Sequence, residues 1–238
     1  MSAARESLLD AAHTALARRP WSAVRMVDVA AAAGVSRQTL YNEFGSKDGL
    51  ARALVRRAAD GCLAGVDRAL TAYDDPRDRL VAAAEWTVSA ARENALVRAL
   101  LTGCWNDRVP APVLAAVPSS SVVPAQRRAD GPLPSPGDFV TLVRDRAVAA
   151  LTAPGGRTSA AAEPFTTAER IRAAAHARPG EPVRSAEPAR SGEPAASAEL
   201  VRCCELVVRL ALSCVAAPPP GKDGVADLVR GALAGREL

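Results

Sequence analysis

The chain has 238 residues, enough for one large domain or two modest ones, and 49% of them are apolar, which is enough for a real core. Aromatic residues make up only 3%, so the apolar content is mostly Ala, Val and Leu and favours helices over β-sandwiches. The formal net charge of +4 is mildly basic and by itself fits a nucleic-acid partner, a membrane surface or neither.

Several classes of protein are disfavoured at this point. No run of about 18 apolar residues occurs, which argues against a membrane-spanning helix, and the first residues lack the apolar core of a signal peptide. The chain has five cysteines, an odd number, and none of them shows a CxxC spacing. Both facts argue against a disulfide scaffold or a zinc site. We therefore expect a cytoplasmic helical protein with no catalytic residues, no metal and no cofactor, and with no membrane partner.

The first 72 residues contain clear helix start and stop signals. Pro20 stops the first helix and Gly34 suits the left-handed turn that closes the second. Ser36 and Ser46 are natural N-caps for the third and fourth. We predict helices at Ala3–Arg18, at Val24–Ala33, from Ser36 through Phe44, and from Ser46 to Thr71 or Ala72.

The prolines divide the rest of the chain unevenly. Seven of them fall within Pro110–Pro136, where only short pieces of helix fit. The helical pattern of Arg77–Asn106 has a weak point at Arg92–Asn94 that would divide it into two helices. Further amphipathic helices are predicted at Gly137–Ala153, Glu199–Ala217 and Val225–Glu237.

Residues 180–197 form three tandem hexapeptides, GEPVRS, AEPARS and GEPAAS. A proline every six residues excludes a helix in our interpretation, and the absence of bulky apolar residues excludes a core strand. The unit is also too short for a solenoid repeat. We interpret the repeat as a disordered or polyproline-II-like linker, with one candidate helix before it at Thr166–Arg178; a docking peptide is the alternative.

Residues 29–40, VAAAAGVSRQTL, have the spacing of a helix-turn-helix. Ala30 is small where the second helix crosses, Gly34 makes the turn and Leu40 closes the small core. This leaves polar side chains on the outer face of a short helix, where a recognition helix carries the groups that reach the major groove. They are Arg37, Gln38, Thr39, Tyr41 and Asn42.

Residues 34–50, GVSRQTLYNEFGSKDGL, closely resemble the hallmark of TetR/AcrR-type transcriptional regulators. The likeness covers about residues 5–60, and beyond them only the architecture is similar. The resemblance implies an all-α fold: an N-terminal three-helix DNA-binding domain with a helix-turn-helix, then a helical ligand-binding and dimerisation domain. We expect the DNA-binding domain at 1–50, the first part of the ligand domain at 51–153, a low-complexity insertion at 154–198 and dimerisation helices at 199–238.

The resemblance also implies roles for single residues. It places Arg37, Gln38 and Tyr41 near base edges, where Arg pairs well with guanine and Gln with adenine. Contacts to the DNA backbone would come from Thr39, Tyr41, Lys47 and Arg25, and Asn42 could do either. The N-cap residue Ser36 completes the predicted DNA-binding set. The full set is Arg25, Ser36, Arg37, Gln38, Thr39, Tyr41, Asn42 and Lys47.

Charge supports the same assignment independently. Lys47 lies in the first turn of a helix, where a cation opposes the helix dipole unless a phosphate binds there. Residues 1–60 carry nine basic and six acidic side chains, so +3 of the net charge of +4 lies in this part. Ordinary solvated surface residues are the alternative interpretation of this set.

The resemblance further implies a small-molecule ligand, and an apolar or neutral one is favoured because few charges lie on the apolar helix faces. The bulky residues available to line its cavity are Trp86, Leu100, Leu101, Cys104, Trp105, Phe139 and Leu142. Ordinary helix packing is the alternative for each of them. A thiol sensor is conceivable, although burial as small apolar residues is the commoner state of cysteines.

The helix at Glu199–Ala217 has an apolar arc too wide for packing on one side, which indicates a second contact surface. Together with Val225–Glu237 it would form a dimer interface through Leu206, Leu210, Leu228, Val229 and Leu233. The prediction is a homodimeric repressor on a pseudo-palindromic double-stranded operator, released by its ligand. The alternatives are an activator or a thiol-responsive regulator of the same fold, or a helical adaptor that does not bind DNA; an enzyme is disfavoured because no nucleophile–base pair or metal cluster can be assembled.

Overall fold

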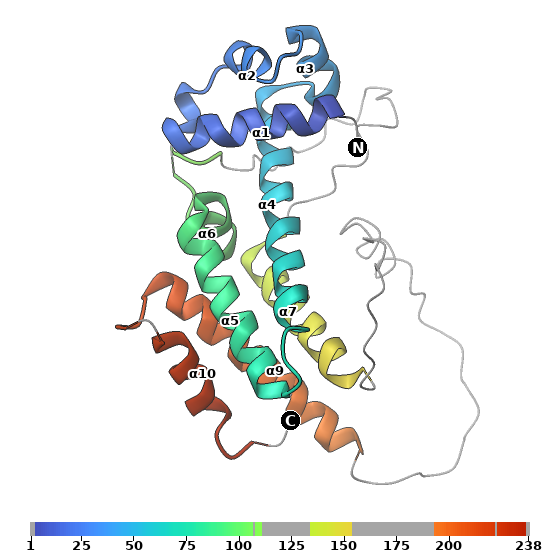
Figure 1. Ribbon diagram of the computed structural model, residues 1–238, viewed down its shortest axis with the longest axis vertical. Helices are drawn as coiled ribbons and strands as arrows, with labels where there is room; N and C mark the ends of the chain where they lie inside the picture. Colours follow the sequence, from blue (N-terminus) through green and yellow to red (C-terminus); the bar gives the residue numbers. More distant parts are fainter. Residues whose placement is uncertain (1–2, 107, 111–133, 154–192, 222, 237–238) are drawn as a thin grey trace, which may run out of the picture.

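The computed structural model describes residues 3–106, 108–110, 134–153, 193–221 and 223–236. All regular structure within these ranges is helical, as predicted (Figure 1). The α-helices are α1 (Ala3–Arg18), α2 (Met26–Ala32), α3 (Arg37–Phe44), α4 (Lys47–Ala69), α5 (Pro76–Glu93), α6 (Ala95–Thr102), α7 (Pro136–Thr152), α9 (Glu193–Ala216) and α10 (Gly224–Leu233), with a short 3-10 helix, η1, at Trp21–Ala23.

Most helix starts are fixed by side chains that cap them. Ser36 and Ser46 accept hydrogen bonds from the backbone N–H groups of Thr39 and Gly49, so both predicted N-caps are confirmed. Asn94 ends α5 and caps α6 at once, because its side chain accepts from the N–H groups of the next helix. The predicted division of the Arg77–Asn106 pattern is therefore confirmed.

The start of α9 differs from the prediction. The helix begins at Glu193 rather than Glu199 and thus includes the last proline of the hexapeptide repeat, Pro194. A proline in the first turn costs little, because its missing N–H would have no partner inside the helix anyway. The remainder of the repeat, the candidate helix at Thr166–Arg178 and the proline-rich stretch 111–133 lie outside the described residues.

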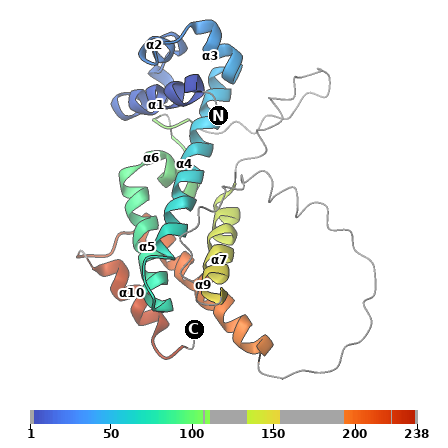
Figure 2. The same ribbon diagram turned by 45° about the vertical axis from the view of Figure 1, so that its right-hand side comes forward.

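The long helix α4 connects the two ends of the molecule (Figure 1). Its first turns pack with α1 and α3 at one end, and its later turns lie beside α5 at the other. Helix α5 packs against α4, α6, α9 and α10, while α7 packs on α9 (Figure 2). Buried apolar residues form one cluster from Leu8 in α1 to Leu233 in α10. Each helix of the described residues is too short or too polar to cross a bilayer.

Helices α4 and α5 make close contact at Gly65. A Cβ at this position would lie 1.9 Å from Cε2 of Trp86, so only glycine fits beneath the indole. The indole Nε1 of Trp86 donates a hydrogen bond of 3.1 Å to the carbonyl of Cys62. The contact therefore fixes both the separation of the two helices and the orientation of Trp86.

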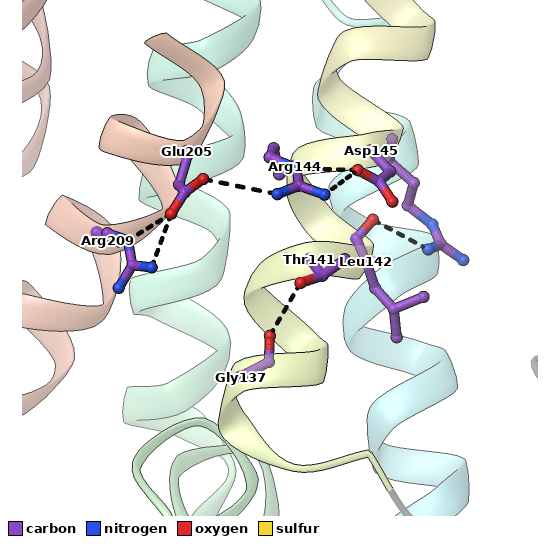
Figure 3. A network of polar contacts seen from close by, with 8 residues as sticks. Gly137, Thr141, Leu142, Arg144, Asp145, Glu205 and Arg209 are labelled. Carbon is purple, nitrogen blue, oxygen red and sulfur yellow. Dashed lines mark hydrogen bonds and ion pairs between the residues drawn. The ribbon is translucent and has the colours of Figure 1, made fainter. Parts of the chain in front are cut away.

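A row of charged residues joins α7 to α9 (Figure 3). The Glu205 carboxylate lies 2.7 Å from Arg209 on its own helix and 3.6 Å from Arg144 on α7. The hydrogen bond from Arg209 lowers the pKa of Glu205. Arg144 also pairs with Asp145 at 2.8 Å, so the contact between the helices is made by a chain of alternating charges. Solvent-exposed pairs of this kind contribute little to stability and mainly fix the register of the helices.

Candidate nucleic-acid interface

Helices α2 and α3 form the helix-turn-helix that the spacing predicts. Ala30 and Leu40 are buried, at 2% and 0% exposure, and form its small core. The turn passes through Gly34 at φ 69°, in the left-handed region that favours glycine. The N–H of Val35 donates to the carbonyl of Ala30 at 3.1 Å and closes the turn.

The outer face of α3 carries its polar side chains in two interacting pairs. Gln38 Nε2 donates to Asn42 Oδ1 at 2.9 Å, and both residues are exposed. The Arg37 guanidinium lies 5.3 Å from the centre of the Tyr41 ring. These contacts hold four of the predicted DNA-binding residues in defined positions on this face in the absence of DNA.

Lys47, the first residue of α4, is directed at the segment between α1 and α2. Its ammonium donates to the carbonyl of Ser22 at 3.2 Å and lies 5.2 Å from the centre of the Trp21 ring. Partial burial lowers the pKa of this ammonium, while the nearby Asp48 acts in the opposite direction. Neither contact neutralises the charge, which therefore remains available to an anion at the N-terminus of the helix.

A groove of about 350 Å³ brings half of the predicted DNA-binding set together. Arg25, Arg37, Tyr41 and Lys47 line it, while the N-cap Ser36 and the α3 residues Gln38, Thr39 and Asn42 lie outside it. The groove is also lined by four residues that the sequence analysis did not single out: Ser22, Val24, Met26 and Val27.

Val27 and Trp21 are the most informative of the residues that sequence reasoning missed. Val27 is 50% exposed although it is large and apolar, because it falls off the face of α2 that buries Met26 and Val29. An apolar residue off the core face of a helix-turn-helix is a signal that could have indicated a contact surface. Trp21 gave no such signal, because its partner Lys47 is distant in sequence.

The acidic residue nearest to Arg25 is Asp28, which is shared between two arginines. Its carboxylate lies 3.3 Å from Arg25 and 3.1 Å from Arg19. Because a single carboxylate faces two guanidinium groups, this part of the groove keeps a positive charge. The pair also orients Arg25 along α2.

The turn between α3 and α4 requires close backbone approach. Gly45 has φ 71°, and a Cβ on Gly49 would lie 1.9 Å from the carbonyl oxygen of Phe44. Arg5 of α1 lies over the Phe44 ring at 4.6 Å and donates to the carbonyl of Glu43 at 3.2 Å. The recognition helix is thus fixed at its end by both α1 and α4.

Most of the residues predicted to line a ligand cavity belong to the helical core or lie at its edge. Leu100, Leu101 and Phe139 are at most 3% exposed and belong to the packed interior, whereas Cys104 is exposed. Trp86 lines a cavity of about 290 Å³, and the other six predicted residues do not line it. The remaining members of the set, Trp105 and Leu142, are half-buried beside the core.

The residues predicted for dimerisation divide into two groups. Leu228 is 47% exposed, and Leu206 and Leu210 are half-buried, so these three reach the surface of the protomer. Val229 and Leu233 are each 1% exposed and contribute to the core of the single chain instead.

Four of the five cysteines are buried: Cys62, Cys203, Cys204 and Cys214. Burial raises the pKa of Cys62 to about 11 and that of Cys204 to about 12, which keeps both as unreactive thiols. Cys104 is exposed.

Comparison with known proteins places this interface in a wider context. Residues 8–54 match the family model described as bacterial regulatory proteins, tetR family. The chain is 52% identical over 68 residues to the HTH-type transcriptional regulator AlkX of Mycobacterium tuberculosis, an alignment that covers 29% of this chain and 32% of that protein. It is 41% identical over 81 residues to the HTH-type transcriptional activator FasR of Mycolicibacterium smegmatis, which covers 34% and 37%.

The chain therefore spans about a third of the length of these curated relatives. A solved structure extends the likeness in fold, though not in sequence: the TetR family repressor AlkX from Dietzia sp., implicated in biodegradation of n-alkanes, matches with a TM-score of 0.50 at 20% identity, over 96% of this chain and 94% of that one. The family model thus covers the helix-turn-helix, and the likeness to the solved structure is one of fold.

Proposed function

We propose that the protein is a homodimeric, ligand-responsive transcriptional repressor, because residues 8–54 match the family model of bacterial regulatory proteins, tetR family. The observation that carries the proposal is the groove in which Arg25, Arg37, Tyr41 and Lys47 come together beside an exposed recognition helix. The partner is a pseudo-palindromic double-stranded operator, and the protein acts in the bacterial cytoplasm, where that DNA is.

In the proposed complex α3 enters the major groove. Gln38 and Asn42 share a hydrogen bond that a base edge replaces, and Gln is suited to bidentate contact with adenine. Arg37 is suited to guanine and stacks beside Tyr41 in the free protein. Ser36, which caps the helix start, and Thr39, whose backbone N–H donates to Ser36, approach the DNA backbone.

Phosphate contacts come from the rim of the groove. The ammonium of Lys47 and the free N–H groups at the start of α4 converge on one anion position. Arg25 lies on the same groove and reaches the backbone from α2. These contacts fix the orientation of the protein on the duplex and carry no sequence information themselves.

Dimerisation is proposed through α9 and α10, with Leu206, Leu210 and Leu228 at the contact. The exposure of these leucines in the protomer supports this choice over the buried Val229 and Leu233. A two-fold axis there would present two recognition helices to half-sites about 34 Å apart. The domain plan of the chain, with its DNA-binding unit first and its dimer helices last, is part of the same proposal.

Ligand binding is proposed to lower operator affinity by altering the tilt of α4. The physical requirement is that the ligand binds the operator-incompetent spacing more tightly than the competent one, by only a few kcal/mol. Catalysis and cofactors form no part of the proposal, since the family model and the named relatives are those of regulators.

The proposal is tested by selecting bound fragments from genomic DNA with the purified protein at moderate salt. Recovery of one inverted-repeat sequence, protected in two adjacent major grooves on one face of the duplex, is the expected result. Failure to retain any fragment, even at low salt, would instead favour a helical adaptor that does not bind DNA.

Activation is the second candidate, because one relative is named a transcriptional activator. The two are separated by transcription in vitro from a promoter that carries the selected operator. A repressor lowers transcript yield when added to RNA polymerase, and an activator raises it. A thiol-responsive regulator would change its operator affinity on mild oxidation, an effect that Cys104→Ser would abolish because Cys104 is the exposed cysteine.

A further inference from the structure

Val27, in the first turn of α2, presents an apolar side chain to the groove proposed to receive DNA. It is 50% exposed and lines the groove beside Arg25 and Lys47. Two other aliphatic or thioether side chains line the same groove, those of Val24 and Met26, but they are buried, at 2% and 9% exposure. Among the lining residues, Val27 therefore supplies the exposed aliphatic surface.

The local structure does not account for an exposed valine at this position. Valine forms helices less readily than alanine, because its branched side chain is restricted beside the preceding turn. Met26 and Val29 make the core contacts of α2, and Val27 falls off the face that they share. A single exposed valine is nevertheless common on protein surfaces, and it is the surroundings of Val27 that distinguish it.

The surroundings of Val27 combine three cations with one aromatic ring. Arg25, Arg37 and Lys47 line the same groove. The Arg37 guanidinium lies 5.3 Å from the centre of the Tyr41 ring, which lines the groove as well. The closely spaced phosphates of DNA match this concentration of positive charge. An apolar group among these cations must then face a part of DNA that carries no charge.

Val27 is also held in a defined position. The carboxylate of its neighbour Asp28 lies 3.3 Å from Arg25 and 3.1 Å from Arg19, which follows α1, so these ion pairs join the start of α2 to the end of α1. The branched side chain of valine has few rotamers. A partner that contacts Val27 therefore meets methyl groups whose position is largely fixed before binding, and little conformational entropy is lost.

Thymine carries the uncharged group that fits this position. Val27 has no donor or acceptor, so a phosphate, an amino group or a carbonyl oxygen placed against it would lose hydration without gaining a hydrogen bond. The apolar group that base edges present in the major groove is the C5-methyl group of thymine. Helices α2 and α3 lie side by side (Figure 1), and α3, proposed to enter the major groove, lines the same groove through Arg37 and Tyr41.

We propose that Val27 is a specificity-determining residue whose methyl groups contact the 5-methyl group of one thymine in each half-site of the operator. This contact depends on the DNA-binding function proposed above and adds to it a base contact from α2, beside those from α3. It distinguishes thymine from cytosine, which carries a hydrogen at C5, without any hydrogen bond. The same methyl group occurs on 5-methylcytosine, and synthetic DNA separates the two sources.

The experiment starts from operators that the full-length protein selects from a synthetic random duplex library, which contains no methylated cytosine. Each thymine of a half-site is then replaced singly by deoxyuridine, which removes the methyl group and keeps the hydrogen-bonding edge of the base. At one position we expect binding to weaken about fourfold, the effect of one buried methyl group. At that position 5-methylcytosine should bind about fourfold more tightly than cytosine. Fluorescence anisotropy titrations measure all four affinities.

The Val27→Ala variant assigns the contact to this residue. We expect it to fold with an unchanged Tm, because the position is half exposed and alanine is a good helix former. It should bind operators with thymine and with deoxyuridine equally at the sensitive position, and a double-mutant cycle between protein and DNA measures the coupling. Val148→Ala shortens a half-buried valine of α7 and is the matched control, which should keep the full discrimination. Gln38→Ala should keep it as well, since Gln38 is proposed to contact a different base.

The outcomes for the contact and for the proposed function are distinguishable. If an operator is selected but no thymine is sensitive to loss of its methyl group, or if every sensitive position stays sensitive in the Val27→Ala protein, the thymine contact is disproved while DNA binding stands. A Val27→Ala protein that binds all duplexes more weakly by one common factor would place Val27 against the sugar–phosphate backbone instead. Retention of no DNA at all would disprove the proposed function, and the thymine contact with it.

Discussion

The ammonium of Lys47 and the indole ring of Trp21 lie 5.2 Å apart, in a contact between the first turn of α4 and the segment that joins α1 to α2. Trp21 is itself fixed by a residue far along the chain, because its backbone N–H donates a hydrogen bond of 3.2 Å to the carbonyl of Arg108. The cation proposed to bind phosphate is therefore positioned by residues from two distant parts of the chain.

We predict that Lys47→Ala weakens binding to every DNA sequence and lowers the slope of log affinity against log salt by about 1, since one phosphate contact is lost. Titrations at several salt concentrations measure this slope. Arg92→Ala removes an exposed cation of α5 that does not line the groove, and it should leave the slope unchanged. Equal slopes for Lys47→Ala and the unaltered protein would exclude the phosphate contact.

Trp21→Ala is expected to weaken DNA binding less than Lys47→Ala, because the charge remains while its position is lost. The two changes should not be additive, and a double-mutant cycle measures the difference. Trp105→Ala is the matched control, as it removes another half-buried indole, from the segment that follows α6. Full additivity would show that Trp21 acts on DNA independently of Lys47.

Gln38→Ala should change which sequences are bound rather than how tightly DNA is bound in general. The loss of one bidentate base contact corresponds to about 1–3 kcal/mol of discrimination at one position of the half-site. Binding to a panel of operators with single base changes measures it, and binding to a random fragment is the internal control. An unchanged preference at all positions would place Gln38 outside the base contacts.

Substitutions of Gly34 and Gly61 by alanine are expected to change the free energy of unfolding in opposite directions. Neither has an atom within 4 Å of an added Cβ, but Gly34 has φ 69° whereas Gly61 is helical. Gly34→Ala should lower the free energy of unfolding by about 1 kcal/mol, and Gly61→Ala should raise it by about 0.5–1 kcal/mol. Urea unfolding followed by circular dichroism measures both, and effects of the same sign would contradict the argument.

Leu228 and Val229 are neighbours on α10 with opposite exposure, 47% and 1%. Leu228→Glu should therefore dissociate the proposed dimer with little change in the secondary structure of the protomer. Val229→Ala should instead destabilise the fold by about 2 kcal/mol through loss of buried volume. Sedimentation velocity and thermal unfolding separate the two effects; a Leu228→Glu protein that remains dimeric would move the interface elsewhere.

The helices were predictable because their starts are local. A serine or an asparagine at the right position accepts the N–H groups of the next turn, and Ser36, Ser46 and Asn94 could be identified without knowledge of the fold. The start of α9 at Glu193 was not predictable in this way. Prolines of the repeat argue against a helix, and Pro194 is tolerated because it lies in the first turn. The face of the recognition helix followed from its period for the same local reason.

The cavity beside Trp86 was not predictable from bulky residues. Leu100 and Phe139 lie on apolar helix faces, which is equally the pattern of core packing, and both are buried. The cavity is instead lined by residues of α1, α4, α5 and α6, and its shape depends on the distances between these helices. Such distances are set by contacts between residues far apart in sequence.

The close contact of Gly65 with Trp86 fixes the position of α4 relative to α5 at one point along its length. The 18 residues from Gly65 back to Lys47 form an arm of about 27 Å at 1.5 Å per residue. A rotation of α4 by about 5° at this contact would move Lys47 by roughly 2 Å, enough to break a hydrogen bond to a phosphate. A small change in the angle of α4 at this contact would therefore be enlarged at Lys47, where DNA is proposed to bind.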